Sequence, residues 1–397
     1  MAKRILLTTF TFLPNKDGVA MASANLARGL AERGYKVTVA TAYHPDRTHM
    51  DMSGVRVIQF EVDGFANLGN RASGKTEEYV RFVRSFPCDT ILCQCWDTWS
   101  TVLAQRTFSD HYAKKILISH GFSAHLLPFH RKPPFGLGVW LRQLPFAFAA
   151  PRTLRLFDHV IFLSAKRDHL RFFDHTLAHW TGYQNHSSIP NGVRQDEFES
   201  KDLSFRDAFK IETRDVVLSV ANYSDRKNQL KALETFAESG AEDTTLVFIG
   251  HEYNEYAERL EASLSELRKR GFKSPVKILH GLGRKEVCAA YQAATVFLLT
   301  AKAETQPIVL LEALANRVPF VSTDTGCIRE LSGGIVGHSK RQLVAGLRKL
   351  LDDEAERTRL GGVGQALIQR EYQWSAIIDR YVALLEKLSP TATIARR

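Results

Sequence analysis

Two carboxylates, Glu304 and Glu312, bracket a short stretch whose residue types could bind a diphosphate. The stretch follows an apolar run at residues 295–300 that predicts a buried strand, and its own apolar residues recur at helical spacing. Pro307 suits the first helical turn, where Thr305 could serve as the cap. Because a helix N-terminus offers unpaired N–H groups and a partial positive charge, this turn predicts an anion site.

The spacing of the two glutamates decides what they could contact. In a helix extending to about Asn316, residues at this separation lie roughly 12 Å apart along the axis and within about 80° of each other. A diphosphate at the helix N-terminus would then have a carboxylate near each of its ends. Taken alone, the same spacing also fits an ordinary amphipathic helix with a solvated glutamate at either end.

Two cations and a histidine stand at other places where a ligand could bind. Arg226 and Lys227 follow an apolar strand predicted at 215–222 and precede a predicted helix, a combination that suits a phosphate. A solvated helix start has the same composition, so that interpretation also stays open. His120 ends a strand predicted at 115–119 and precedes a glycine, where it could contact a ligand or only complete the strand end.

The elements that must position these residues form two alternating series. Strand, loop, helix and strand are predicted at 3–9, 12–18, 19–33 and 37–41, and a second series begins at residue 215. This alternation predicts α/β domains with doubly wound parallel sheets, whose ligands bind at the carboxyl edge. The loop at 12–18 contains no G-x-G-x-x-G sequence, which disfavours dinucleotide binding.

The stretch around the two glutamates resembles a family signature. Glu304 and Glu312, the strand Val318-Pro-Phe-Val-Ser322 and the turn Thr325-Gly326 together resemble the retaining glycosyltransferases of the GT-B fold, glycosyltransferase family 4, also termed glycosyl transferases group 1. The resemblance covers most of the chain and is strongest at 216–330. It implies an α/β fold of GT-B architecture, in which two facing Rossmann-like doubly wound domains enclose a cleft.

The same resemblance sets the domain borders. Residues 1–190 would form an acceptor-side domain, and residues 191–372 would bind the nucleotide-sugar donor. A last helix at 373–390 would pack back on the first domain. Residues 195–214 are rich in polar and charged side chains, which predicts a linker between the two domains.

The resemblance also implies roles for individual residues. Glu312 would accept hydrogen bonds from the ribose hydroxyls, Glu304 would position the transferred sugar without acting as a nucleophile, and Lys227 would bind the diphosphate. His120 would orient the sugar. The implied catalytic residues are His120, Lys227 and Glu304; the implied donor-binding residues are Gly18, Asn222, Arg226, Lys227, Leu282 (through its backbone, to the base), Thr305, Gln306, Pro307, Ile308, Val309 and Glu312.

Two positions depart from the family pattern. Asn222 stands where the family has an arginine on the diphosphate, a charge that Arg226 could supply. The loop after the first strand often carries paired glycines near the donor phosphates, and here Gly18 stands alone, preceded by Asp17.

The resemblance implies transfer of a sugar, with retention, from a UDP- or GDP-sugar to a hydroxyl of a glycan, a lipid-linked acceptor or a small molecule. The leaving diphosphate would be stabilised by protein cations and a helix N-terminus, so neither a metal nor another cofactor is expected. Two alternatives stay open: a nucleotide-sugar epimerase of related fold, which would need no acceptor, and a non-catalytic sugar- or polyanion-binding protein.

Composition limits the partners. The chain has 397 residues, 24% charged and 44% hydrophobic, and no apolar run of membrane-spanning length. The formal net charge is +10, with eleven Lys or Arg against three Asp between Thr101 and Phe173. Phosphate in a substrate, an anionic membrane surface and nucleic acid could each explain this, but no nucleic-acid-binding motif accompanies it, so nucleic acid is disfavoured.

Aromatic and basic residues alternate at 122–150, which suits either a lipid-linked acceptor at a membrane surface or core aromatics under a loop. The five cysteines are odd in number and lack metal-type spacing, so we expect reduced thiols in a cytoplasmic protein, peripheral on the membrane's cytoplasmic face if it binds lipid. His175 and His179 could share a helix face, but spacing assigns no third ligand, and no metal site is expected.

Overall fold

A computed structural model describes residues 3–15, 17–49, 54–64, 72–121, 149–165, 173–198 and 204–388. Most of the aromatic and basic stretch at 122–150 lies outside the described residues, so neither interpretation of it is tested. The chain divides into two compact units: residues 1–191 together with 374–397, and residues Gly192–Gln373. These borders lie one residue from those expected at 190 and 372.

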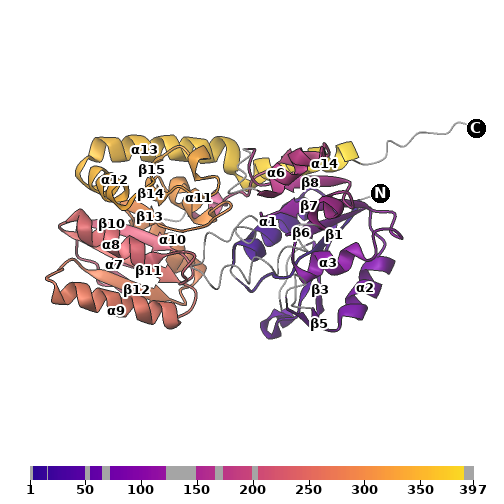
Figure 1. Cartoon of the computed structure of the whole chain (residues 1–397), viewed down its shortest axis with the longest axis horizontal. Helices are drawn as coiled ribbons and strands as arrows, with labels where there is room; N and C mark the ends of the chain where they lie inside the picture. Colours follow the sequence, from indigo (N-terminus) through magenta and orange to yellow (C-terminus); the bar gives the residue numbers. More distant parts are fainter. Residues whose placement is uncertain are drawn as a thin grey trace, which may run out of the picture. The chain divides into compact units, whose positions relative to one another are not determined.

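The first unit is built on a parallel sheet of seven strands in the order β3-β2-β1-β6-β7-β8-β9 (Figure 1). The order reverses beside β1, as in a doubly wound sheet. The strands are β1 Arg4–Thr8, β2 Lys36–Ala42, β3 Val55–Phe60, β6 Thr90–Gln94, β7 Lys114–Ser119, β8 His159–Phe162 and β9 His186–Ser188, with a small antiparallel pair of β4 Val62–Asp63 and β5 Ser73–Gly74.

Helices cover both faces of this sheet because successive residues of each strand point to opposite faces. Ile5 and Leu7 pack against α1 Gly18–Glu32 and α14 Trp374–Leu388. Leu6, between them, belongs to the core on the other face. That core contains residues of α2 Thr76–Ser85, α3 Trp99–Gln105 and α6 Phe173–Trp180, and a 3₁₀ turn, η1 Pro45–His49, follows β2.

The second unit repeats the arrangement with six parallel strands in the order β12-β11-β10-β13-β14-β15. Residues Val216 and Leu218 of β10 enter the core that includes α10 and α11, whereas Val217 enters the core that includes α8, α9 and α12. The strands are β10 Asp215–Val220, β11 Thr244–Gly250, β12 Val276–His280, β13 Val296–Leu299, β14 Phe320–Thr323 and β15 Gly334–Gly337. The helices are α7 Ser204–Ala208, α8 Gln229–Ser239, α9 Glu255–Lys269, α10 Arg284–Ala293, α11 Ile308–Ala315, α12 Lys340–Asp352 and α13 Glu354–Leu367, with the short 3₁₀ helices η3 Gln195–Phe198 and η4 Ile328–Glu330 and the short π-helix η5 Ile368–Tyr372.

The predicted α/β class with two Rossmann-like doubly wound halves is therefore confirmed. The linker predicted at 195–214 is wrong. This segment contains η3 and α7, and Phe198, Phe205 and Ile211 are buried in the core that also contains α10 residues. A few apolar residues among many charged ones are enough to anchor the segment, a pattern that average composition conceals. Within the described residues, no helix is long and apolar enough to cross a membrane.

The chain's last described helix, α14, packs on α1 through a glycine. A Cβ atom placed on Gly29 would lie 2.4 Å from Cγ1 of Ile378, which is 1% exposed. Beside this contact, the Arg33 guanidinium pairs with Asp379 at 2.8 Å. The close approach of the two helices thus depends on the missing side chain at Gly29.

Gly29→Ala should lower the free energy of unfolding by about 1–3 kcal/mol, because the added methyl group overpacks the α1–α14 contact. Gly362→Ala is the matched control, since a Cβ there meets nothing within 4 Å and alanine favours the α13 helix. Urea denaturation of both variants checks this. Equal stabilisation of both would show that the α1–α14 contact has room for a side chain.

Candidate functional site

The structure brings Lys227 and Glu304 together at one edge of the second sheet. β10 and β13 are parallel neighbours, so the loops that follow them emerge at the same carboxyl edge. Lys227 lies on the first loop and Glu304 on the second, and the Lys227 Nζ atom is 2.5 Å from Glu304 Oε1. The lysine side chain is 16% exposed and the glutamate 8%, so the pair is largely removed from water.

Two hydrogen bonds to backbone carbonyls tie the two loops to each other. The Lys302 N–H donates to the Arg226 carbonyl at 2.8 Å, and the Thr300 hydroxyl donates to the Asn228 carbonyl at 2.8 Å. Asn228 adopts a left-handed backbone conformation with φ of 56°, which turns the chain from the Lys227 loop into α8. The ammonium of Lys227 is therefore presented from a fixed turn.

A third loop, which follows β14, packs closely against the backbone of Glu304 and Thr305. A Cβ atom on Gly326 would lie 2.3 Å from the Thr305 carbonyl oxygen and 2.6 Å from that of Glu304, and Gly326 has φ of 52°. The next residue, Cys327, donates its N–H to the Thr305 carbonyl at 3.0 Å. The predicted Thr-Gly turn thus serves to hold the glutamate loop in place.

The expected helix at this site begins later than predicted. α11 starts at Ile308, with Pro307 as an N-cap that makes no side-chain cap hydrogen bond, and it ends before Asn316. The predicted cap at Thr305 is therefore wrong, and so is the 12 Å axial spacing, because Glu304 precedes the helix. The reason is Pro307, which disfavours helical backbone in the residue before it.

Glu312, inside α11, is held by an arginine that sequence reasoning missed. Arg284 Nη2 lies 2.7 Å from Glu312 Oε1. The same guanidinium donates from Nε and Nη2 to Glu197 Oε2 at 2.9 and 2.5 Å. Arg284 follows the Gly281-Leu-Gly283 loop assigned to the base, which is a signal that could have pointed to it. Glu197 lies in the segment predicted as a linker, where no sequence signal indicated a contact with Arg284.

Burial and charge change the proton affinities around this pair. Although burial alone would lower it, Glu312 and Glu197 raise the pKa of Arg284 above its ordinary value. Burial, followed by the carboxylate of Glu312, raises the pKa of Tyr291 well above its ordinary value. Burial also raises the pKa of Cys288 to about 11. The guanidinium is thus a fixed charge, and the phenol and thiol next to it are neutral at physiological pH.

The remaining predicted donor-binding residues of this unit differ in exposure. Asn222 and Arg226 are exposed after β10. Leu282 and Val309 are half-buried against the core, and Ile308, the first residue of α11, is also half-buried. Gln306 and Pro307 are buried and Thr305 is half-buried. The predicted residues around α11 thus follow one another along one loop and helix start, next to the Lys227–Glu304 pair.

His120 lies at the corresponding edge of the first sheet. Its Nε2 atom is 2.7 Å from Oε1 of Gln94, the last residue of β6. Burial lowers the pKa of His120 to about 4, although the carboxylate of Asp17 opposes the shift. The imidazole is consequently neutral at pH 7 and can both donate and accept a hydrogen bond. The residue after Gln94, Cys95, has φ of 67°, an uncommon backbone conformation for a non-glycine residue.

Gly18 is the first residue of α1, and a carboxylate already caps this helix. Oδ1 of Asp17 accepts hydrogen bonds from the N–H groups of Val19 and Ala20, both at 3.0 Å, and the Thr11 hydroxyl donates to Oδ2 at 2.6 Å. A phosphate beside Gly18 would therefore meet a like charge at the N–H groups it needs. This arrangement weighs against Gly18 as a phosphate contact.

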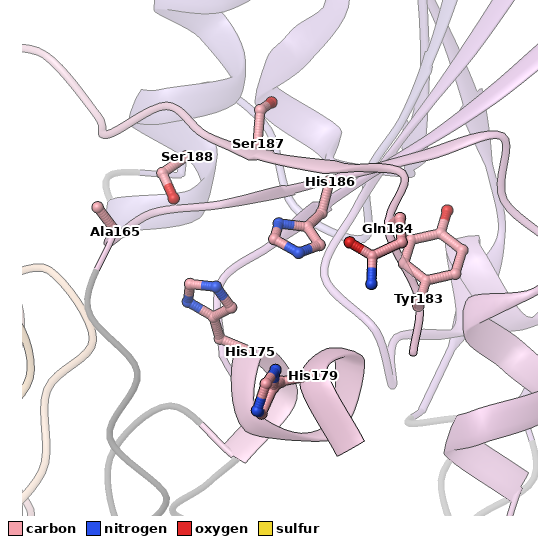
Figure 2. A pocket seen from close by; sticks show the side chains of 8 residues that line it. All are labelled: Ala165, His175, His179, Tyr183, Gln184, His186, Ser187 and Ser188. Atoms are coloured by element: carbon pink, nitrogen blue, oxygen red, sulfur yellow. The ribbon is translucent and has the colours of Figure 1, made fainter. Parts of the chain in front are cut away.

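A polar pocket of about 420 Å³ lies in the first unit between α6 and β9 (Figure 2). Its described lining includes His175 and His179, which do share a face of α6, together with His186. The His175 ring is stacked on Phe162, with 4.5 Å between the ring centroids, and meets the His186 ring edge-on at 5.3 Å. Among the described residues, no three histidine, cysteine or acidic side chains are arranged to hold a metal ion.

Comparisons with known proteins agree on the family. Residues 17–171 match the family described as Glycosyl transferase 4-like domain, and residues 200–366 match the family described as Glycosyl transferases group 1. The two matches cover most of the chain and divide it near the border between the two units. No curated protein matches the chain in sequence.

Solved structures share the fold over nearly the whole chain. Sucrose-phosphate synthase from Thermosynechococcus elongatus has a TM-score of 0.78 at 16% identity, covering 97% of this chain and 99% of that one. HepE from Anabaena, in complex with UDP and glucose, has 0.75 at 16%, covering 97% and 100%. An α,α-trehalose 6-phosphate synthase from Burkholderia multivorans has 0.70 at 15%, covering 98% and 99%. At such identities the likeness establishes the fold alone, which is that of GT-B enzymes.

The burial of His120 predicts that part of the free energy of unfolding is lost as the pH falls. Because the folded-state pKa of about 4 lies below the unfolded value near 6.5, the unfolded chain takes up the proton first as pH falls. This contribution is complete above pH 6.5 and is lost as pH falls toward 4. His120→Gln should reduce the loss of unfolding free energy between pH 7 and pH 5 by about 1–2 kcal/mol.

Urea denaturation of the wild type and the variant at both pH values measures this difference. An NMR titration of the imidazole gives the same answer directly. A midpoint near 6.5, or an identical pH dependence in the two proteins, would contradict the buried neutral state of His120.

Proposed function

Because this chain belongs to the glycosyl transferases of group 1, we propose that it transfers a sugar from a nucleotide diphosphate sugar to a hydroxyl acceptor with retention at the anomeric carbon. The observation that carries the proposal is the buried Lys227–Glu304 pair beside the start of α11. It combines a cation for a diphosphate with a carboxylate for sugar hydroxyls, at the edge where such sheets bind ligands. UDP is the first nucleotide to test, because HepE was solved with UDP-glucose and with UDP.

Lys227 is proposed to stabilise the leaving diphosphate. Without donor, its charge is matched by Glu304. A diphosphate at the N-terminus of α11 would offer the ammonium a second anion, so Lys227 could turn to the ligand with its own charge still paired, while sugar hydroxyls take its place on Glu304. Charge on the leaving oxygen grows in the transition state, so the interaction with Lys227 strengthens there and lowers the barrier.

Glu304 is proposed to position the transferred sugar. Once the ammonium contacts the diphosphate, the Glu304 carboxylate can accept hydrogen bonds from sugar hydroxyls. Its backbone, fixed by the Gly326 and Cys327 contacts, keeps it at one place relative to α11. A front-face attack assisted by the leaving phosphate then needs no protein nucleophile. His120, neutral at pH 7, is proposed to orient the sugar through one hydrogen bond.

The diphosphate site needs a second cation because Asn222 carries no charge. The Asn222 carbonyl accepts a hydrogen bond from Gln229 at 3.1 Å, which fixes the backbone before the Lys227 loop. Arg226 has its carbonyl held by Lys302 while its side chain is exposed. We propose that this side chain contributes the charge that Asn222 lacks, and that no metal ion is required.

The acceptor is proposed to be a hydroxyl of a glycan, a lipid-linked sugar or a small molecule. Two of the similar structures are, by their names, synthases of phosphorylated disaccharides, which supports a sugar acceptor. The excess of basic residues between 101 and 173 supports an acceptor that carries phosphate or lies at an anionic membrane surface. We propose a cytoplasmic location, where nucleotide sugars would be available.

Nucleotide binding without metal is the first test of the proposal. Thermal melts with UDP, GDP or ADP in the presence of EDTA should show stabilisation by one of them, about 2.7 kcal/mol at 100 times the dissociation constant. Turnover of the matching nucleotide sugar with a sugar acceptor should also survive EDTA. Stabilisation or turnover that appears only when magnesium or manganese is added would overturn the metal-free mechanism.

Lys227→Ala should lower kcat by about 100-fold or more, the effect expected when a cation that stabilises a leaving group is removed. Lys340→Ala is the matched control, because it removes another lysine–glutamate pair of the same unit, Lys340–Glu238 at 2.6 Å, from an exposed position. Steady-state rates of nucleoside diphosphate release measure both. A Lys227→Ala enzyme with wild-type kcat would refute the role.

A further inference from the structure

One guanidinium in the second unit is shared by two carboxylates. Arg284 contacts Glu312 on α11 and Glu197 on η3, at 2.7 and 2.5 Å from its Nη2 atom. The three side chains come from elements that are distant in sequence and adjacent in space. The Glu312 side chain is 10% exposed, Glu197 is 25% exposed and Arg284 is 34% exposed. The cluster thus opens to solvent on the arginine side, while Glu312 is nearly enclosed.

The arginine is itself held in place. It is the first residue of α10, whose start is fixed because the Gly283 N–H donates to the Glu286 side chain at 2.6 Å. Its guanidinium lies over the ring of Phe198, 5.5 Å from the centroid. Phe198 is buried and packs edge-on against Tyr291, with 6.0 Å between the centroids. A planar, permanently charged group with these contacts keeps a defined orientation toward Glu312.

A held carboxylate binds a diol better than a free one. The last torsion of a glutamate is broad, so an unrestrained Glu312 would lose rotational freedom on binding a hydroxyl. Arg284 engages Oε1 and so restricts the rotation of the carboxylate that receives a donor. It also keeps a negative charge on Glu312 stable in a nearly enclosed position, because an unpaired carboxylate there would be costly.

We propose that Arg284 is a positioning residue for Glu312, and that this pair makes the donor site selective for ribonucleoside over 2′-deoxyribonucleoside diphosphates. The proposal rests on the function proposed above and specifies its substrate class. A ribose with both hydroxyls donates to the fixed carboxylate, whereas a 2′-deoxyribose lacks one donor. Sugars carried on deoxythymidine diphosphate are therefore disfavoured as donors.

The test compares ribonucleotide and deoxyribonucleotide affinity in one set of variants. Isothermal titration calorimetry with UDP, GDP and ADP, and with their 2′-deoxy forms, gives the ratio of dissociation constants for the wild type, Arg284→Gln and Arg284→Lys. The wild type should prefer one ribonucleotide by roughly tenfold or more over its deoxy form, the size of a hydrogen bond to a charged group. Arg284→Gln should bring this ratio close to one, mainly by weakening the ribonucleotide.

Arg284→Lys should keep part of the preference, because it retains the charge but loses the planar fork that contacts both carboxylates. Arg268→Gln is the matched control. Arg268 lies over Phe272 at 4.9 Å and donates to the carbonyls of Phe272 and Ser274, so its loss removes an arginine–aromatic contact in the same unit without touching Glu312. The control should keep the wild-type ratio, and melting temperatures of all variants show that they are folded.

The outcomes separate this proposal from the function on which it rests. If the wild type binds no nucleotide, the proposed function is overturned and this proposal with it. If it binds a nucleotide but Arg284→Gln weakens the ribo and deoxy forms equally, Arg284 is only structural and this proposal alone is overturned. An Arg284→Gln variant with the wild-type ratio, or one too unstable to titrate beside an Arg284→Lys variant with the wild-type ratio, overturns it too.

Discussion

The largely buried ion pair between Lys227 and Glu304 constrains the rest of the candidate site. Each charge would be costly to bury alone, so neither side chain can leave the pair unless another charged or hydrogen-bonding group replaces its partner. The pair in turn requires the loops after β10 and β13 to stay together, which their mutual hydrogen bonds ensure. It also requires the Glu304 loop to stay against Gly326, where no side chain fits. A nucleoside diphosphate meets this condition for Lys227, because its phosphates can replace the Glu304 carboxylate as the negative partner of the ammonium.

Both glutamates of the predicted signature are thus paired with a cation, but in opposite senses. At Lys227–Glu304 the proposed ligand is anionic, so the cation is the group that changes partner while the carboxylate becomes available to the sugar. At Arg284–Glu312 the proposed ligand group is a neutral diol, so nothing has to be displaced and the cation remains as a support. The Lys227–Glu304 pair therefore suits a site whose ion pair is exchanged during the reaction. The Arg284–Glu312 pair suits a site that recognises a ligand without rearranging.

Sequence reasoning predicted the sheets and the two glutamates for clear physical reasons. Buried parallel strands appear as continuous apolar runs, and the alternation of Ile5, Leu6 and Leu7 between two cores shows why both faces need helices. The helix start was placed wrongly because Pro307 belongs outside the helix, so spacing alone overestimated its length. Arg284 and Glu197 were missed because their meeting depends on a packed segment whose few aromatic anchors are hidden among charged residues.

The family resemblance implies an arginine at the position of Asn222, and in the proposed site the positive charge is instead carried a few residues later in the chain. A nucleoside diphosphate needs cations near its phosphates, and the loop after β10 still supplies Arg226 and Lys227 within a few residues of the strand. Lys227 is largely enclosed and already paired with Glu304, so it turns to a ligand from one starting position. Arg226 is exposed, and its backbone is fixed by Lys302, so its long side chain can follow a ligand of variable shape. An enclosed cation and an exposed one can therefore share the proposed contacts to the diphosphate.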